Sequence, residues 1–269
     1  MAKLKDYSEL TFIDDFMFCK ILTSRPELCK ELLELILGMK IKRIKFPESQ
    51  KTIEQTYDGR GIRLDVYIED ANNTVYDLEM QTTEQKDLPK RTRYYQGMID
   101  LNLIQRGSKF KALKKSYIIF ICLTDPFGKN LPIYTFENRC MQDESIALED
   151  ETYKVIINAD GNRDELSDEM SDFLDFLQGK ENDGKLSGKL EEAVKKAIDK
   201  KEWEVDYMTM LMKLKEENES GQILGYIKAL ADCNFSKKEI AKKLKAEFQL
   251  SPEEIEEKFK EYEAILQPA

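Results

Sequence analysis

Apolar residues near the start of the chain recur at the spacing of a helix. Two such series follow one another between Thr11 and Gly38, namely Phe12, Phe16, Ile21 and Leu22, and then Leu28, Leu32, Leu33, Leu35 and Ile36. Pro26 is typical of the first turn of a helix, and Gly38 is typical of the position just after a helix ends. The pattern therefore predicts two consecutive helices.

The next part of the chain changes to the patterns of β-strands. The predicted strands are Thr52–Tyr57, Gly61–Glu69, Thr74–Thr82, Ser116–Leu123, Ile133–Phe136 and Tyr153–Ile157. Ser116–Leu123 is apolar almost throughout, as in a strand that is covered on both faces. Pro89 opens a further helix that runs to about Arg106, and Gly107 ends it. Strands and helices in this order predict an α/β fold.

Two neighbouring strands alternate so regularly that their pairing can be predicted. In GIRLDVYIED and TVYDLEMQT, every second residue is apolar. Burying both apolar faces on one side pairs Val66 with Leu78. The same register places Asp65 directly across from Glu79, and it requires an odd-length connection of about three or five residues around Asn72.

Two carboxylates held opposite each other in a sheet repel, and a divalent cation would relieve that repulsion. The oxygens of Asp65 and Glu79 suit Mg²⁺, which keeps several waters and can activate one of them against a phosphodiester. Gln81 projects toward the same place and could orient the attacking water. The alternative is an ordinary polar face on an amphipathic hairpin, and the hairpin alone leaves both interpretations open.

The composition excludes several kinds of catalytic site. The 269 residues contain no histidine, which removes Ser-His-Asp triads, H-E-x-x-H zinc sites and nucleases with a histidine base. The five cysteines lack any C-x-x-C spacing, which argues against a disulfide framework or a thiolate zinc site and favours buried free thiols. Hydrolysis would have to use carboxylates, lysine, tyrosine or a metal ion.

The net charge of −10 opposes DNA binding, but the charge is unevenly distributed. Residues 86–115 include nine basic and two acidic residues, whereas residues 137–175 include thirteen acidic and three basic ones, as a solvated face would. At the start of the helix that Pro89 opens, Lys90, Arg91 and Arg93 can meet phosphates together with the helix N-terminus. Tyr95 follows as a further candidate DNA contact, with core packing as its alternative.

The order of these motifs resembles the PD-(D/E)xK nuclease superfamily, and most closely the Rpn family of recombination-promoting nucleases and transposases. The resemblance covers about residues 10 to 160, and its most specific pieces are Asp15-Phe-Met-Phe18, Leu64-Asp-Val66, Leu78-Glu-Met-Gln81, Arg91, Arg93 and Tyr94-Tyr95. It implies a restriction-endonuclease-like mixed β-sheet flanked by helices, Mg²⁺-dependent cleavage of DNA, and metal binding by Asp65 and Glu79.

Three features of the sequence leave alternatives open. The superfamily usually has a lysine where this chain has Gln81, so a catalytically silent DNA-binding or protein-interaction module on the same fold is the main rival. Asp15 could supply an auxiliary acid, or it could simply favour the positive end of its helix. An RNase H-like transposase with three dispersed carboxylates ranks lower, because the two best acids here share one hairpin.

The remaining predictions concern organisation and location. The polar, glycine-rich segment 179–188 is expected to be a linker between a nuclease-like domain at 1–178 and a helical region at 189–269. Two helices of that region form either a helix-turn-helix-like unit or a small bundle, which could serve a homo-oligomer. The N-terminal sequence lacks the apolar block of a signal peptide and no segment suits a membrane span, so a cytoplasmic protein is expected.

Overall fold

The computed structural model describes residues 5–45, 47–53, 61–233 and 235–266. They divide into two compact units, residues 1–200 and residues 201–269. In the part of the chain that is described, no helix has both the length and the apolar character needed to cross a membrane.

The first unit contains the whole sheet. Its main elements in chain order are α1 (Asp15–Ser24), α2 (Pro26–Leu37), β1 (Glu48–Ile53), β2 (Ile62–Glu69), β3 (Val75–Gln81), α3 (Leu88–Leu103), β4 (Ser116–Cys122), β5 (Ile133–Phe136), β6 (Thr152–Asn158), α4 (Asp168–Leu177) and α5 (Lys185–Ile198). Gly38 caps α2 in the left-handed conformation, with a φ of 62°, as its position in the sequence predicted. The predicted strand Thr52–Tyr57 overlaps β1 at residues 52 and 53, and its residues 54–57 lie outside the described residues.

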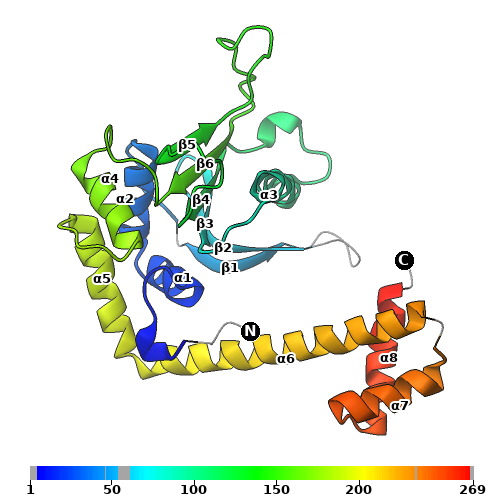
Figure 1. Cartoon of the computed structure of the whole chain (residues 1–269). Helices are drawn as coiled ribbons and strands as arrows, with labels where there is room; N and C mark the ends of the chain where they lie inside the picture. The colour runs from blue at the N-terminus through cyan, green and yellow to red at the C-terminus, as the bar shows by residue number, and fades with distance from the viewer. Residues whose placement is uncertain (1–4, 46, 54–60, 234, 267–269) are drawn as a thin grey trace. The chain divides into compact units, whose positions relative to one another are not determined.

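The six strands form one mixed sheet in the order β1-β2-β3-β4-β6-β5. Neighbouring strands are antiparallel except that β4 runs parallel to both β3 and β6. Helix α3 covers one face of the sheet, and α1, α2 and α4 lie on the other (Figure 1). This arrangement confirms the expected α/β fold, a mixed sheet flanked by helices.

The hairpin of β2 and β3 has the register that the alternation predicted. Val66 pairs with Leu78, and the last pair before the turn is Glu69 with Val75. The connection is therefore 70–74, one of the two expected lengths. Asp70 stabilises it, because the Asp70 carboxylate accepts hydrogen bonds from the backbone N–H of Asn72 at 2.8 Å and of Thr74 at 2.9 Å.

The face of the sheet under α3 is a closed apolar core. Leu88 and Ile99 of α3 pack in one buried cluster with Ile118 and Phe120 of β4. Residues that are paired across neighbouring strands point to the same face, so the pairing of Asp77 with Ile118 turns that aspartate toward α3 as well. The polar face predicted for the hairpin is consequently covered by a helix.

Helix α5 belongs to the first unit, although the sequence analysis placed it beyond a linker. It packs against α1, α2 and α4. Leu186, Leu190 and Ala197 on its apolar face are buried, and the backbone oxygen of Ala197 accepts a hydrogen bond from the Tyr7 hydroxyl at 2.7 Å. The boundary between the compact units thus follows residue 200, and the glycine-rich segment before α5 is a short connection within the first unit.

The second unit is a small helical bundle, one of the two arrangements expected for this region. It consists of α6 (Lys201–Asp232), α7 (Lys237–Phe248) and α8 (Pro252–Leu266). The three helices share a cluster formed by Ile223, Ile227, Ile240, Leu244, Ile255 and Phe259. Capping boxes begin α7 and α8, where Ser236 pairs with Glu239 and Ser251 with Glu254.

Candidate active site

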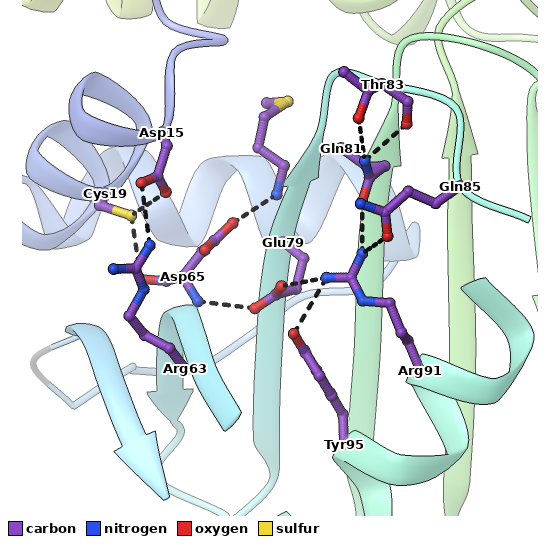
Figure 2. A network of polar contacts seen from close by, with 11 residues as sticks. Asp15, Cys19, Arg63, Asp65, Glu79, Gln81, Thr83, Gln85, Arg91 and Tyr95 are labelled. Atoms are coloured by element: carbon purple, nitrogen blue, oxygen red, sulfur yellow. Dashed lines mark hydrogen bonds and ion pairs between the residues drawn. The ribbon is translucent and has the colours of Figure 1, made fainter. Parts of the chain in front are cut away.

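The hydrogen-bonded ladder between β2 and β3 ends at the pair of Val66 and Leu78. Beyond this pair, side-chain carboxylates accept the backbone N–H groups in place of backbone oxygens. The Glu79 Oε1 atom accepts the backbone N–H of Asp65 at 2.8 Å, and the Asp65 Oδ2 atom accepts the backbone N–H of Met80 at 3.1 Å. Figure 2 shows the two carboxylates between the diverging strands. The two acids that the register placed opposite each other are thus linked across the break, each through a backbone N–H of the other strand.

Burial makes these carboxylates electrostatically unusual. Glu79 is only 3% exposed. Desolvation, followed by the nearby Asp15 carboxylate, raises the pKa of Asp65 to about 7. Desolvation also raises the pKa of Glu79 well above its ordinary value, and the neighbouring charges of Asp77 and Asp65 add to the effect. The protein therefore concentrates negative charge in a place from which water is largely excluded.

Asp77 is a third buried acid that the sequence analysis did not identify as part of the site. It is fully enclosed beneath α3, and neither of its carboxylate oxygens has a hydrogen-bond partner in the part of the chain that is described. Burial and the charge of Asp65 raise the pKa of Asp77 well above its ordinary value. These surroundings favour the protonated form of the Asp77 carboxyl, and that form could donate a hydrogen bond.

Helix α1 brings two further groups to Asp65 from the other side of the strands. The Cys19 thiol donates to the backbone oxygen of Asp65 at 3.4 Å and contacts Asp15 Oδ1 at 3.6 Å. Potential metal-ligand atoms of Asp15, Cys19 and Asp65 all lie within 4.8 Å of one another. Burial raises the pKa of the Cys19 thiol, so this group stays protonated and the oxygens of the two aspartates are the available ligands.

Arg63 limits how freely Asp15 can act. Its guanidinium lies 3.7 Å from Asp15 Oδ2, and both side chains are partly exposed. Asp15, the acid that the sequence suggested as auxiliary, lies close to Asp65. Its carboxylate also pairs with Arg63, which partly neutralises its charge. Neither Cys19 nor Arg63 was a candidate in the sequence, because only the packing of α1 against β2 brings them together.

Helix α3 supplies the cationic side of the site. Arg91 Nη1 donates to Gln81 Oε1 at 2.7 Å, and Arg91 Nη2 lies 3.7 Å from Glu79 Oε2. The same guanidinium donates to the Tyr95 hydroxyl at 3.2 Å and to the Gln85 side chain. Figure 2 shows Arg91 reaching Glu79 from α3, with Tyr95 bonded to the Arg91 guanidinium. Arg91, which the sequence suggested as a phosphate contact, thus lies within the acidic site.

Gln81 is fixed at both ends of its side-chain amide. Its oxygen accepts from Arg91, and its nitrogen donates to the Thr83 backbone oxygen at 2.7 Å and to the Thr83 hydroxyl at 3.2 Å. Gln81 is buried, with 9% of its surface exposed. A water molecule that used this amide would have to use the second lone pair of its oxygen, because the nitrogen is already engaged.

The other candidate DNA contacts lie on the open side of α3. Lys90, Arg93 and Tyr94 are exposed, and together with Arg63, Arg91 and Tyr95 they line a groove with a volume of about 450 Å³. The helix begins at Leu88 with Pro89 in its first turn, so Lys90 lies near the positive end of the helix. A basic groove therefore borders the acidic site.

The donors at this site fit a hard divalent cation. Asp15 and Asp65 offer carboxylate oxygens, the ligands that Mg²⁺ prefers, beside a neutral thiol. Glu79 lies next to this group and accepts the backbone N–H of Asp65. A cation would also relieve the repulsion that raises the pKa values of Asp65 and Glu79. The geometry and the charge both favour a metal centre at the place where β2 and β3 part.

A mixed sheet with converging acids on a central hairpin, bordered by a basic groove, defines a nuclease-like protein. A family model described as PD-(D/E)XK nuclease family transposase matches residues 13–224, and the chain belongs to this family. The match includes every residue of the site described above. No curated protein and no solved structure matches the chain.

Proposed function

We propose that this protein is a Mg²⁺-dependent DNA endonuclease of the Rpn type, which hydrolyses phosphodiester bonds. Membership of a PD-(D/E)XK nuclease family supports this function. The observation that carries it is the meeting of Asp65 and Glu79 at the break in the β2–β3 ladder, where both acids are desolvated and linked to backbone N–H groups. Such fixed carboxylates need little reorganisation to act as metal ligands.

Asp65 and Glu79 would hold the cation, and Asp15 would assist from α1. When bound, Mg²⁺ supplies Lewis acidity toward a phosphate oxygen and lowers the pKa of water. The protein positions these ligands through the hydrogen bonds from Asp65 N–H to Glu79 and from Met80 N–H to Asp65. Gln81 is held beside them by Arg91 and Thr83, so its amide contributes a fixed dipole.

The basic groove would hold the DNA backbone. The exposed side chains of Lys90 and Arg93 supply positive charge near the N-terminus of α3, and Tyr94 and Tyr95 add aromatic surface. Contacts of this kind attract phosphates without reading bases. They also provide positive charge beside the carboxylates, where DNA would have to approach a protein with a net charge of −10.

The direct test is cleavage of supercoiled plasmid by the purified protein in Mg²⁺ and in EDTA. We expect cleavage in Mg²⁺ alone, and its loss in both Asp65→Asn and Glu79→Gln. These substitutions remove charge while keeping an oxygen that can accept the backbone hydrogen bond. Full activity in either variant, or cleavage that persists in EDTA, would contradict the assignment of the metal ligands.

Gln81 favours a second candidate function, a DNA-binding module that has lost catalysis. The motif that gives the family its name has a lysine two residues after the second acid, and this chain has Gln81 there. Such a module would bind plasmid in a gel-shift assay but leave it uncut with Mg²⁺ or Mn²⁺. The same preparation thus distinguishes the two functions.

A further inference from the structure

The lysine of the family motif is absent from β3 in this chain, but an arginine on α3 lies close to the same position. Gln81 occupies the position at which the family motif names a lysine. Arg91 Nη1 binds the side-chain oxygen of Gln81 at 2.7 Å, and Arg91 Nη2 is 3.7 Å from Glu79. A positive charge therefore stands beside both residues, although it comes from a different element of the fold.

The surroundings of Arg91 hold its guanidinium against Gln81 and Glu79, although Arg91 also lines the groove. Its guanidinium donates to Tyr95 and to Gln85, and it lies 5.1 Å from the centre of the Phe120 ring and 5.5 Å from that of Tyr95. Only 23% of its side chain is exposed. Phe120 pairs with Glu79 across β3 and β4, so the ring beneath Arg91 belongs to the floor of the site.

Arg93 provides the contrast within the same helix. It is exposed and lines the groove. A mobile, hydrated arginine of this kind suits a phosphate contact, whereas Arg91 would have to abandon its partners to become one. Two arginines that are separated by one residue therefore have different surroundings, and we expect different roles.

We infer that Arg91 supplies from α3 the positive charge that the family motif has on β3, and that it serves the cleavage step by holding Gln81 and Glu79 in position. This inference rests on the proposed function. Arg91 is a positioning residue here, because it contacts Gln81 and Glu79 and reaches the reaction through them. The inference replaces the expectation from sequence that Arg91 mainly strengthens DNA binding.

The test is a double-substitution cycle with wild type, Gln81→Lys, Arg91→Ala and the combined variant, and with Arg93→Ala as the matched control. Single-turnover cleavage of plasmid in Mg²⁺ at saturating protein gives the rate of the chemical step. Fluorescence anisotropy of a labelled DNA duplex in EDTA gives the affinity separately. Arg91→Ala and Arg93→Ala each remove one positive charge from the same helix, so a general charge effect would be equal in both.

We expect Arg91→Ala to slow cleavage at saturation at least about tenfold, as the loss of one preorganised charged group does, with DNA affinity close to that of wild type. Arg93→Ala should instead weaken affinity, and its effect on the saturating rate should be smaller than that of Arg91→Ala. Gln81→Lys should restore most of the rate in the Arg91→Ala background, since a lysine on β3 returns the charge to the site. If Arg91 only stabilised the fold, Gln81→Lys would not restore the cleavage rate in this way.

Two results would overturn the inference. The first is an Arg91→Ala protein that loses affinity as Arg93→Ala does and keeps the saturating rate. The second is a folded double variant that cleaves no faster than Arg91→Ala. A wild-type protein that cleaves no DNA would refute the proposed function instead. The role of Arg91 would then be tested by a measurement that does not require cleavage.

That measurement is the melting temperature in EDTA. Gln81→Lys should lower the melting temperature in the wild-type background, because it crowds two cations, and raise it in the Arg91→Ala background, because it restores a partner for Glu79. This change of sign requires the two positions to share one electrostatic site. Equal effects of Gln81→Lys in both backgrounds would show that Arg91 does not supply the charge at position 81.

Discussion

The substitution Asp65→Asn should change how the stability of the metal-free protein depends on pH. Asparagine retains an oxygen that can accept the Met80 N–H, so the change removes charge and preserves the hydrogen bond. Burial and Asp15 raise the pKa of Asp65 from 3.8 to about 7. The difference between these two pKa values corresponds to about 4 kcal/mol of stability.

The sign follows from which state binds the proton more tightly. The folded protein holds the Asp65 proton more tightly than the unfolded chain does, so the stability from this group is complete below about pH 4. It is lost as the pH rises toward and through about 7. In EDTA, the free energy of unfolding of wild type should therefore fall between about pH 4 and pH 8, and that of Asp65→Asn should fall less steeply. Asp77 and Glu79 titrate in the same direction and leave some slope in the variant.

The assay is a set of thermal melts of both proteins across this pH range, in EDTA and in Mg²⁺. Near pH 8 in EDTA, Asp65→Asn should melt above wild type by several degrees, since a domain of this size shifts by roughly 2 to 4 °C per kcal/mol. Mg²⁺ should narrow this difference, because wild type gains about 2.7 kcal/mol at one hundred times Kd and the variant lacks a charged ligand. Parallel pH profiles with equal responses to Mg²⁺ would refute the buried metal site.

Three further perturbations test other parts of the structure. Arg93→Ala should flatten the log-log salt dependence of DNA binding by about 0.9, the value for one phosphate contact, and Lys195→Ala on α5 should leave the slope unchanged. Asp77→Asn should gain melting temperature relative to wild type as the pH is raised, because burial raises the pKa of the Asp77 carboxyl and wild type loses stability when that group ionises. Deleting residues 201–269 should leave a cooperatively melting first unit, whereas deleting residues 189–269 removes most of α5 and should abolish cooperative melting.

The hairpin was predictable because strands have a period of two. Once Val66 and Leu78 must face the same core, every other residue of the two strands is assigned to a face, and the pairing of Asp65 with Glu79 follows. The connection of residues 70–74 agrees with the odd length that this register requires. Local periodicity was thus sufficient to predict that Asp65 and Glu79 lie across from each other, without any knowledge of the rest of the fold.

The environment of the pair was not predictable from the same periodicity. Asp77 and Glu79 have the spacing of a solvated face, yet β4 pairs with β3 and α3 covers both strands, so these acids are buried. Arg91 enters the site because the connection from β3 to parallel β4 must cross the sheet, and that crossing contains α3. Contacts of this kind join segments that are distant in sequence, and no local pattern records them.

The domain boundary shows the same limit on a larger scale. The segment 179–188 has the glycine and polar residues of a linker, and composition gave no reason to attach the next helix to the sheet domain. The apolar face of α5 nevertheless packs against three helices of the first unit. A polar segment indicates where the chain reaches the surface. It does not indicate whether the chain returns to the same core.

The break in the β2–β3 ladder links the stability of the fold to the chemistry of the site. Beyond Val66 and Leu78, the strands are joined through the carboxylates of Asp65 and Glu79, each bonded to a backbone N–H of the opposite strand. A substitution by alanine would therefore remove a charge and also leave a backbone donor unpaired, at a cost of about 1 to 3 kcal/mol where that donor is buried. The amide variants keep the donor satisfied and change the charge alone. Loss of cleavage in Asp65→Asn or Glu79→Gln thus reports on the site, whereas the same loss in an alanine variant would combine the effects of the missing ligand and of a loosened hairpin.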